Sequence, residues 1–343
     1  MTTELKKNNI NNPTMSNDLF HKIILSKNFN KTELDALKDL IIEIEELKLE
    51  MDAVVMAHFY AGENIIYSVA DYASDSYDLA LRARDFKAKN IVLAGVKFMA
   101  ETAKLVSPEA RVLLPDIQSG CSLAESVTVE MIAEAKEKYP NAPVVTYMNT
   151  SAEIKAVSDV CVTSSNAFKI LNKMSENEII FTPDRLMAKN LQNEFDEKNI
   201  TKKLIPVGGA CEVHEQFETK YIHIARKDFP DIEILSHPEC PEQVICESDF
   251  SGSTSQIIEY AKKSKNKHFM VMTECGLVNQ MKIELSEKEF ITPCVICPHM
   301  KLNSLEKIRD VLKSPREENI IEIDEKIRKL ALKPIERMFE LAK

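Results

Sequence analysis

Three cysteines recur along the chain at nearly constant spacing. They stand 90 and 86 residues apart, in the segments SGCSLAES, GGACEVHE and CVICPHMK: Cys121, Cys211 and Cys297. Three converging thiolates suit an iron–sulfur cluster or a zinc ion, because both accept soft sulfur ligands. A cluster with three cysteine ligands leaves one iron open, where it can bind a substrate oxygen as a Lewis acid. The spacing therefore predicts a metal centre built from three separate parts of the chain.

Cys294 allows a competing interpretation of the last segment. With Cys297 it forms a C-x-x-C pair, the spacing of a redox dithiol or of half a zinc site. A zinc site of that kind needs a second such pair, and the sequence contains none. Cys294 also has no counterpart beside the other two recurring cysteines. We expect a passive strand residue here, with a redox thiol as the alternative.

Four more cysteines lie outside this pattern. Cys161 and Cys246 stand in strand-like apolar segments, so we expect both in the core. Cys240 and Cys275 lie near the ends of strand-like runs, and we expect them near the site without being ligands.

Two further classes of polar residue recur with the same period. One class follows the first strand-like run of each stretch, 89 and 90 residues apart: His58, Tyr147 and His237. The other follows the next element, 88 and 90 residues apart: Ser76, Ser164 and Thr254. These hydroxyls precede helical stretches, as N-cap residues do, and such helix starts suit a carboxylate or phosphate.

The elements that carry these residues also repeat three times. The apolar runs are AVVMAHFY, NIVLAGVKF and RVLLPD, then APVVTYMNT, EIIFTPD and KLIPVGGAC, then IEILSHPEC, FMVMTECG and FITPCVIC. Alternation with helical segments predicts parallel α/β sheets, whose ligands gather at the carboxyl ends of the strands. A period near 90 indicates whole domains. We therefore expect three homologous αβα domains around a pseudo-threefold axis, with a central active site.

The expected domain boundaries follow from this repeat. The three domains should span residues 31–138, 139–228 and 229–314, the first opening with a helix from about Lys31 to Glu50. Residues 1–30 are Asn-rich and weakly apolar, so we expect a disordered extension. Residues 315–343 should form an amphipathic packing helix that is interrupted near Pro334.

Composition excludes several classes of function. The net charge of −10 gives no support to a nucleic-acid or anionic-membrane partner. No run of eighteen apolar residues predicts a membrane span, and the first residues lack the apolar stretch of a secretory signal. Free thiols in such a chain favour a reducing compartment, so we expect a cytoplasmic protein.

A long, ordered series of motifs resembles the quinolinate synthase family. The series runs MAHFY, GVKFMAETAK, SGCSLAES, YMNTSAEIKAVSD, VTSSNA, GACEVHE, SHPEC, GSTS and CPHMKLN, and it covers nearly everything from Val54 to Leu305. The resemblance implies three related αβα domains around a 4Fe–4S cluster with three cysteine ligands. It also implies condensation of iminoaspartate with dihydroxyacetone phosphate, with loss of phosphate and water, to give quinolinate for NAD biosynthesis. An aspartate oxidase or dehydrogenase that supplies iminoaspartate is a possible functional partner.

The resemblance assigns roles to particular residues of this chain. The cluster ligands of the family match Cys121, Cys211 and Cys297. The iminoaspartate-binding positions match His58, Ser76, Tyr147, Asn149, Ser164, His237, Glu239 and Thr254. Glu239 is the candidate general base, because it stands at a strand end beside His237 in a site that should exclude water. His58, Tyr60 and His214 are the candidates for passing protons or for hydrogen bonding to carbonyl groups.

Three positions depart from the family pattern. Ala61 stands where members of the family often have a Gln after the HFY segment. Ser74 replaces the usual Gly before Asp75 and Ser76, and Met187 stands where a Gly is common in the family. None of them removes a chemical group from the candidate site. Two other functions stay open at this point: a cluster-dependent hydro-lyase acting on another small dicarboxylate, and a non-catalytic iron–sulfur sensor.

Overall fold

The computed structural model describes residues 31–343, so the expected disordered extension at residues 1–30 lies outside the described residues. The described chain forms two compact units. The first contains residues 31–119 and Cys297–Glu322, and the second contains Gly120–Ile296 and Ile323–Lys343. Each unit is described by itself below.

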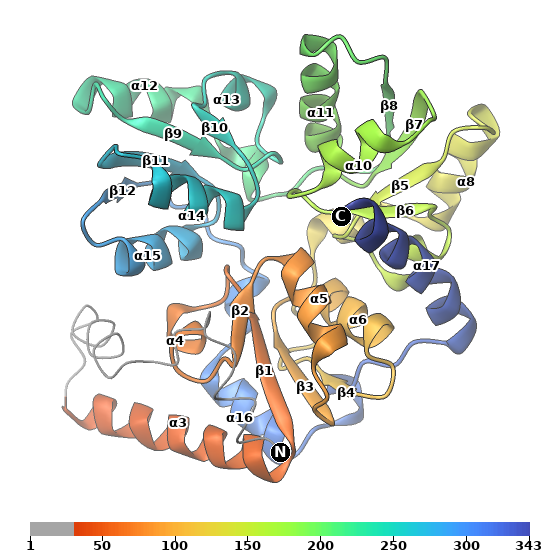
Figure 1. The fold of residues 1–343 in the computed structure, drawn as a ribbon. Coiled ribbons are helices and arrows are strands. Elements are labelled where there is room, and N and C mark those ends of the chain that lie inside the picture. The colour runs from red at the N-terminus through yellow and green to blue at the C-terminus, as the bar shows by residue number, and fades with distance from the viewer. Residues whose placement is uncertain (1–30) are drawn as a thin grey trace. The chain divides into compact units, whose positions relative to one another are not determined.

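Three parallel sheets of four strands each repeat one topology, and the predicted α/β class with three repeats is confirmed (Figure 1). The first sheet has the order β2-β1-β3-β4: β1 (Ala53–His58), β2 (Tyr72–Ser74), β3 (Asn90–Ala94) and β4 (Arg111–Leu113). The second has the order β6-β5-β7-β8: β5 (Val144–Tyr147), β6 (Val160–Val162), β7 (Glu178–Thr182) and β8 (Lys203–Pro206). The third has the order β10-β9-β11-β12: β9 (Glu233–Ser236), β10 (Phe250–Ser251), β11 (His268–Met272) and β12 (Glu289–Ile291).

The helices follow the same repeat. The first unit contains α3 (Lys31–Glu50), α4 (Glu63–Ile66), α5 (Ser76–Asp85), α6 (Lys97–Val106) and α16 (Leu305–Lys313). The second unit opens with α7 (Ser122–Glu125) and α8 (Val129–Lys138). Its two repeats carry α9 (Ala152–Ala156), α10 (Ala167–Lys173), α11 (Arg185–Glu197), α12 (Thr219–Asp228), α13 (Glu242–Cys246), α14 (Thr254–Lys263) and α15 (Cys275–Glu284), and α17 (Glu325–Leu341) ends the chain. The helix expected from about Lys31 to Glu50 is confirmed by α3.

One aspartate per repeat forms the same hydrogen bond in all three sheets. Its carboxylate accepts the N–H of a residue near the start of the first strand, which ties that strand to the segment before the second strand. The three bonds are Val55 N to Asp71 Oδ2, Val144 N to Asp159 Oδ2 and Ile234 N to Asp249 Oδ2, each 2.8 Å. Identical contacts at equivalent positions show that the repeat extends to individual side chains.

Short second strands are the elements that the apolar pattern did not predict. β2, β6 and β10 span three, three and two residues, and each pairs with only one neighbour at the sheet edge. A segment this short shows too little alternation of apolar and polar residues to be recognised. The strands next to them are largely buried: every residue of β5 lies in the interior, as do the last four residues of β1 and the last three of β9.

The packing of each repeat depends on apolar side chains between its sheet and helices. In the second repeat, Ile132 on α8, Val144 on β5 and Ile180 on β7 share one cluster. In the third repeat, Ile222 on α12 and Ile234 on β9 belong to another such cluster. Each fully buried aliphatic side chain stabilises the fold by about 1.5–3 kcal/mol. The strand ends that carry the polar residues are therefore fixed by rigid cores.

The last helix differs from the expectation. α17 is one continuous helix with Pro334 inside it, so the predicted interruption is wrong. Pro334 is buried, and α17 packs along α9 and β6 of the second repeat. A proline removes one backbone hydrogen bond from a helix, and packing along the helix compensates for that loss here.

Capping of the helices after the second strands also differs from the expectation. Asp75 caps α5 by accepting the N–H of Asp78, and Ser253 caps α14 by accepting the N–H of Gln256. Ser76 and Thr254 are therefore the first residues inside their helices. α10 has Asn166 at its N-cap, and Ser164 lies in the loop before it. The three recurring hydroxyls do not cap their helices.

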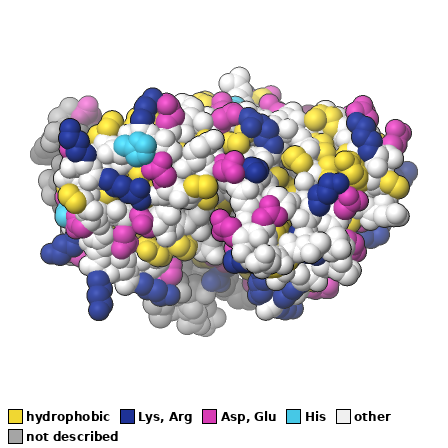
Figure 2. All heavy atoms as spheres, turned by 90° about the horizontal axis from the view of Figure 1, so that it is seen from above, with side chains coloured by type: hydrophobic (Ala, Val, Ile, Leu, Met, Phe, Trp, Pro, Cys, Tyr) yellow, Lys and Arg dark blue, Asp and Glu magenta, His cyan; other side chains and the backbone are white. Residues whose placement is uncertain are grey.

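The surface carries charges of both signs. Figure 2 shows Lys and Arg side chains interspersed with Asp and Glu side chains on the face that it draws. Among the described residues, no helix combines the length and the apolar character that crossing a membrane requires.

Candidate functional site

The second unit brings four of the predicted site residues into one buried group. Tyr147, at the end of β5, donates its hydroxyl to Glu239 Oε1 at 2.5 Å. His214 Nδ1 lies 2.9 Å from Glu239 Oε2, and its ring stacks on that of His237 with the centroids 4.6 Å apart. All four side chains are at most 5% exposed. The second and third repeats thus supply one continuous network of hydrogen bonds.

Both oxygens of Glu239 are engaged in this network. Burial alone raises the pKa of a carboxyl group, but the His237 and His214 rings and the Tyr147 hydroxyl outweigh it and lower the pKa of Glu239. Glu239 is therefore ionised. It can take up a proton only if one of these donors gives way to another group.

His214 connects the carboxylate to a cysteine. Its Nδ1 lies 3.2 Å from Cys211 Sγ, and its Nε2 lies 2.9 Å from Thr273 Oγ1. An ionised carboxylate can only accept hydrogen bonds, so the proton belongs on Nδ1, where Glu239 Oε2 and Cys211 Sγ share it. Nε2 then accepts from the Thr273 hydroxyl, and this contact fixes both the ring and its tautomer.

His237 and Asp184 are the remaining titratable groups of the network. Burial, reinforced by the His214 ring, lowers the pKa of His237 to about 3, so this imidazole is neutral. Burial raises the pKa of Asp184 well above its ordinary value, and the negative charge of Glu239 adds to that effect. Two carboxyl groups therefore lie in the same interior with their pKa values shifted in opposite directions, that of Glu239 downward and that of Asp184 upward. Among the described residues, Asp184 Oδ2 has no hydrogen-bond partner.

The loop before Cys211 depends on glycine. Gly208 has a φ of +122°, and a Cβ there would collide with the carbonyl oxygen of Pro183. Gly209 donates its N–H to Ser126 Oγ at 2.9 Å, in the segment just after Cys121. The loop can take this path because glycine tolerates positive φ and close backbone contact. The result is that the segments of Cys121 and Cys211 lie side by side.

The donor set in the second unit fits a metal centre. Burial raises the pKa of the Cys211 thiol, and the charges of Glu239 and Cys121 raise it further, so Cys121 lies within electrostatic reach. A bound metal displaces such a proton, because thiolate is the ligand form. The ligand atoms of Cys211, His214 and Glu239 also lie within 4.8 Å of one another. Cys297 belongs to the first unit, so convergence of all three recurring cysteines stays a prediction.

The first unit holds the other predicted residues. His58, at the end of β1, is 5% exposed, and its ring meets that of Tyr60 edge-on with the centroids 4.7 Å apart. Tyr60 donates its N–H to His58 Nδ1 at 3.1 Å, and its carbonyl accepts from Lys301 Nζ at 2.7 Å. Ser76 opens α5, and Cys297 is partly exposed three residues before the short helix at Met300–Leu302.

Three other predicted residues, Asn149, Ser164 and Thr254, follow the ends of strands in the second unit. Asn149 follows β5, and its buried Oδ1 has no hydrogen-bond partner among the described residues. Ser164 follows β6, and Thr254 opens α14. Gln256 Nε2 of α14 donates to the carbonyl of Ser165 at 3.4 Å, which joins the segments of these two hydroxyls. An unsatisfied buried acceptor at Asn149 is the kind of group that a ligand can complete.

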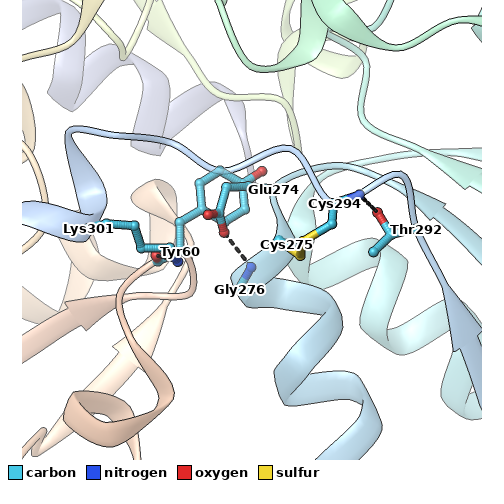
Figure 3. The surroundings of a disulfide bond; sticks show 7 residues. All are labelled: Tyr60, Glu274, Cys275, Gly276, Thr292, Cys294 and Lys301. Atoms are coloured by element: carbon cyan, nitrogen blue, oxygen red, sulfur yellow. Dashed lines mark hydrogen bonds between the residues drawn. A yellow bond between two sulfur atoms is a disulfide. The ribbon is translucent and has the colours of Figure 1, made fainter.

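Cys294 is bonded to Cys275, which contradicts its expected role as a passive strand residue (Figure 3). It lies in the segment after β12 with a φ of +52°, and its N–H donates to Thr292 Oγ1. Cys275 opens α15, next to the N-cap Glu274, whose carboxylate accepts the N–H of Gly276. The disulfide therefore fastens the segment that leads to Cys297 onto the start of α15.

The other cysteines divide between the interior and the surface. Cys161 is buried, as expected, and burial raises the pKa of its thiol to about 12. Cys240 is also buried, and its thiol points at the carbonyl of Met272. Cys246 is exposed at the end of α13, so its predicted place in the core is wrong. Its helix buries the opposite side, through Val244.

Asp184 and Thr273 are residues of the network that the sequence analysis missed. Asp184 caps α11 after β7, and Glu274 caps α15 after β11, at the equivalent place in the next repeat. They stand 90 residues apart in the segments TPD and TEC, which is the same period as that of the recurring cysteines. A search for every acid that obeys this period would have found Asp184, whereas nothing in the period marks Thr273.

Comparison with known proteins identifies the family. Residues 42–340 match the family described as NadA: Quinolinate synthetase A protein. The chain is 43% identical over 295 residues to quinolinate synthase 2 of Mesorhizobium japonicum, covering 86% of this chain and 89% of the relative. It is 42% identical to the quinolinate synthases of Agrobacterium fabrum and Rippkaea orientalis, over 91% and 89% of this chain and 88% and 94% of those proteins. This chain is therefore an enzyme that belongs to the quinolinate synthetase A family.

Proposed function

We propose that this enzyme condenses iminoaspartate with dihydroxyacetone phosphate to quinolinate, with loss of phosphate and water, in NAD biosynthesis. The observation that carries the proposal is the buried network of Tyr147, Glu239 and His214 beside Cys211. The reaction needs proton transfers in a place without bulk water, and this network holds movable protons on two side chains. Family membership supports the same reaction.

Glu239 is proposed as the general base. Its two oxygens already accept from Tyr147 Oη and His214 Nδ1, so substrate must replace one of these donors before Glu239 can remove a proton from carbon. The displaced group then holds a proton that it can return to a leaving oxygen. His214 is suited to this return, because Thr273 keeps its ring in place at 2.9 Å. In the first unit, His58 and Tyr60 are proposed for the other proton transfers.

Substrate binding is proposed to use mostly neutral donors and acceptors. The residues are His58, Ser76, Tyr147, Asn149, Ser164, His237, Glu239 and Thr254. His237 is neutral, so it contributes a hydrogen bond without a charge. The unsatisfied Oδ1 of Asn149 can accept from the imine or a hydroxyl of the substrate. Neutral groups that fit a polar ligand give it orientation, as in most small-molecule sites.

Cys121, Cys211 and Cys297 are proposed to hold a 4Fe–4S cluster. The electrostatic proximity of Cys121 to Cys211 supports the ligation of one metal centre by both sulfur atoms in the second unit. When bound, such a cluster supplies an iron that acts as a Lewis acid on a substrate oxygen. His214, which shares its Nδ1 proton with Cys211 Sγ, would orient this ligand.

The substrates also imply partners and a place in the cell. Iminoaspartate is produced by oxidation of aspartate, so coupling to an aspartate oxidase or dehydrogenase is proposed. A cytoplasmic location is proposed with it, and no nucleic-acid or membrane partner. The disulfide between Cys275 and Cys294 departs from the expectation that all thiols of such a chain are reduced.

An oxygen-free assay tests the function. Purified, cluster-containing enzyme receives freshly generated iminoaspartate and dihydroxyacetone phosphate, and quinolinate is measured by chromatography. Quinolinate should form only when both substrates are present. A preparation with full iron content that forms no quinolinate would refute the proposal.

A further inference from the structure

Lys155 places a buried ammonium group in the second repeat. The residue lies on α9 and is fully buried. Its Nζ donates to the carbonyl of Met148 at 2.9 Å and to the carbonyl of Thr150. Removing an ammonium group from water costs several kcal/mol unless hydrogen bonds or opposite charges compensate. A lysine held inside at that cost serves a purpose that an apolar residue cannot.

The two carbonyls that Lys155 binds flank Asn149. The same loop begins at Tyr147, whose hydroxyl meets Glu239. Thr150 Oγ1 donates to the carbonyl of Tyr147 at 3.2 Å, and the Thr150 N–H donates to the carbonyl of Met148 at 2.8 Å. These bonds make the loop a tight turn closed around one ammonium group. Its conformation sets where the Tyr147 hydroxyl and the unsatisfied Asn149 Oδ1 lie.

The other repeats show that the fold itself does not require a charge at this place. Each repeat has a serine, three residues after the position of Lys155, that donates to a carbonyl four residues earlier. The three bonds are Ser68 Oγ to Asn64 O, Ser158 Oγ to Ile154 O and Ser248 Oγ to Val244 O. Aligned on these serines, the counterparts of Lys155 are Ile65 and Ile245. Both other helices are built with an isoleucine at the same turn.

We propose that Lys155 is a positioning residue for the dicarboxylate substrate, because its ammonium group fixes the Tyr147–Thr150 loop by hydrogen bonds to two of its carbonyls. The identity of that substrate rests on the proposed function. Lys155 acts through the loop and does not itself touch the substrate. Loss of the ammonium group removes a hydrogen-bond donor from both buried carbonyls, and the loop is then expected to move to regain hydrogen bonds. Binding of the dicarboxylate should weaken, while the metal centre and the chemical step are preserved.

The test replaces Lys155 by methionine, which keeps the length of the side chain and removes its charge. Lys136→Met is the matched control, because Lys136 Nζ also donates to two loop carbonyls of the second repeat, Pro140 at 3.3 Å and Ala142 at 2.8 Å. Binding of radiolabelled quinolinate is measured by equilibrium dialysis, together with KM for iminoaspartate, kcat and iron content.

Lys155→Met should raise both Kd and KM at least tenfold, with kcat within threefold of wild type and an unchanged cluster spectrum. Lys155→Arg, which keeps a cation and its donors, should stay within threefold of wild type in all four quantities, and so should Lys136→Met. Unchanged binding by Lys155→Met, or an equal loss in Lys136→Met, overturns the inference. Should the methionine variant not fold, Lys155→Gln replaces it with the same expectation, since its amide is too short to reach both carbonyls. Wild-type enzyme that forms no quinolinate would instead refute the proposed function.

Discussion

The second and third repeats share one scaffold but supply different chemistry. Both have the strand order 2-1-3-4, and both tie their first strand with an aspartate at 2.8 Å. At the end of that strand, the second repeat has the Tyr147 hydroxyl, and Lys155 donates a hydrogen bond to the loop that follows Tyr147. The third offers the neutral His237 and the ionised Glu239. Repetition of the fold has therefore not been accompanied by repetition of the site.

This difference explains how one network forms from two similar halves. Equivalent strand ends bring side chains to the same place, and unlike side chains there can bond to each other, as Tyr147 does to Glu239. If both strand ends carried the same side chain, this hydrogen bond could not form. Two carboxylates would repel each other, and two tyrosines would provide no carboxylate to accept a proton. Changes on one side of the network should therefore have different effects from changes on the other.

The largest effect is expected from the recurring cysteines, which the repeats do share. Cys121→Ala, Cys211→Ala and Cys297→Ala should each abolish the brown absorbance of anaerobically purified enzyme and all quinolinate formation, because each removes one of the three proposed cluster ligands. Cys246→Ala is the control, since this exposed thiol lies outside the network. A normal iron content in any one of the three variants would remove that cysteine from the ligand set.

A substitution at Glu239, in the third repeat, should lower the rate of the reaction without affecting the binding of the cluster. Glu239→Gln keeps the shape of the side chain and removes its ability to take up a proton, so kcat should fall about 10²–10⁴-fold with the cluster retained. Glu242→Gln serves as control, because this partly exposed carboxylate accepts a hydrogen bond from Asn193 of α11 and lies outside the network. Quinolinate formation at the wild-type rate in Glu239→Gln would show that another group is the base.

The sequence was sufficient for features that repeat. Three alternating stretches gave the three sheets, and α3 lies where the helical pattern placed it, at Lys31–Glu50. The period of the polar residues also selected Tyr147 and His237, which lie in the same network. A period is detectable because each copy confirms the others.

Features that occur once were harder to predict. The disulfide joins Cys275 to Cys294, which lie 19 residues apart on segments without a common pattern. Pro334 stays inside α17 because of tertiary packing, which local propensity does not contain. Lys155 and Asp184 look like ordinary surface residues in the sequence, yet both are buried. Their burial depends on what covers them, and that is decided by the fold.

The disulfide allows a test of a feature that only the third repeat has. Closing a loop of this length stabilises a fold by about 3 kcal/mol in the chain-entropy description. Replacing both cysteines by serine, Cys275→Ser with Cys294→Ser, should lower the free energy of unfolding of the second unit by about that amount, as measured by urea titration with circular dichroism. Cys246→Ser should leave the transition unchanged. Alkylation of Cys275 and Cys294 in the unreduced, folded enzyme would show that the bond is not present.

The smallest effect should come from the aspartate that accepts a strand N–H in each repeat, which is the contact that the two repeats share most closely. Asp159→Ala and Asp249→Ala each leave one strand N–H without its acceptor, that of Val144 or of Ile234, at a cost of about 1–3 kcal/mol. Because the two bonds have the same geometry, the two losses in unfolding free energy should agree within about 1 kcal/mol. Asp71→Ala should cost more than either, since Asp71 also pairs with Lys48 at 2.9 Å. If Asp159→Ala had no effect while Asp249→Ala destabilised the protein, the scaffold would not be equivalent in the two repeats. The contrast between their strand ends would then reflect two different folds and not one fold with two kinds of site.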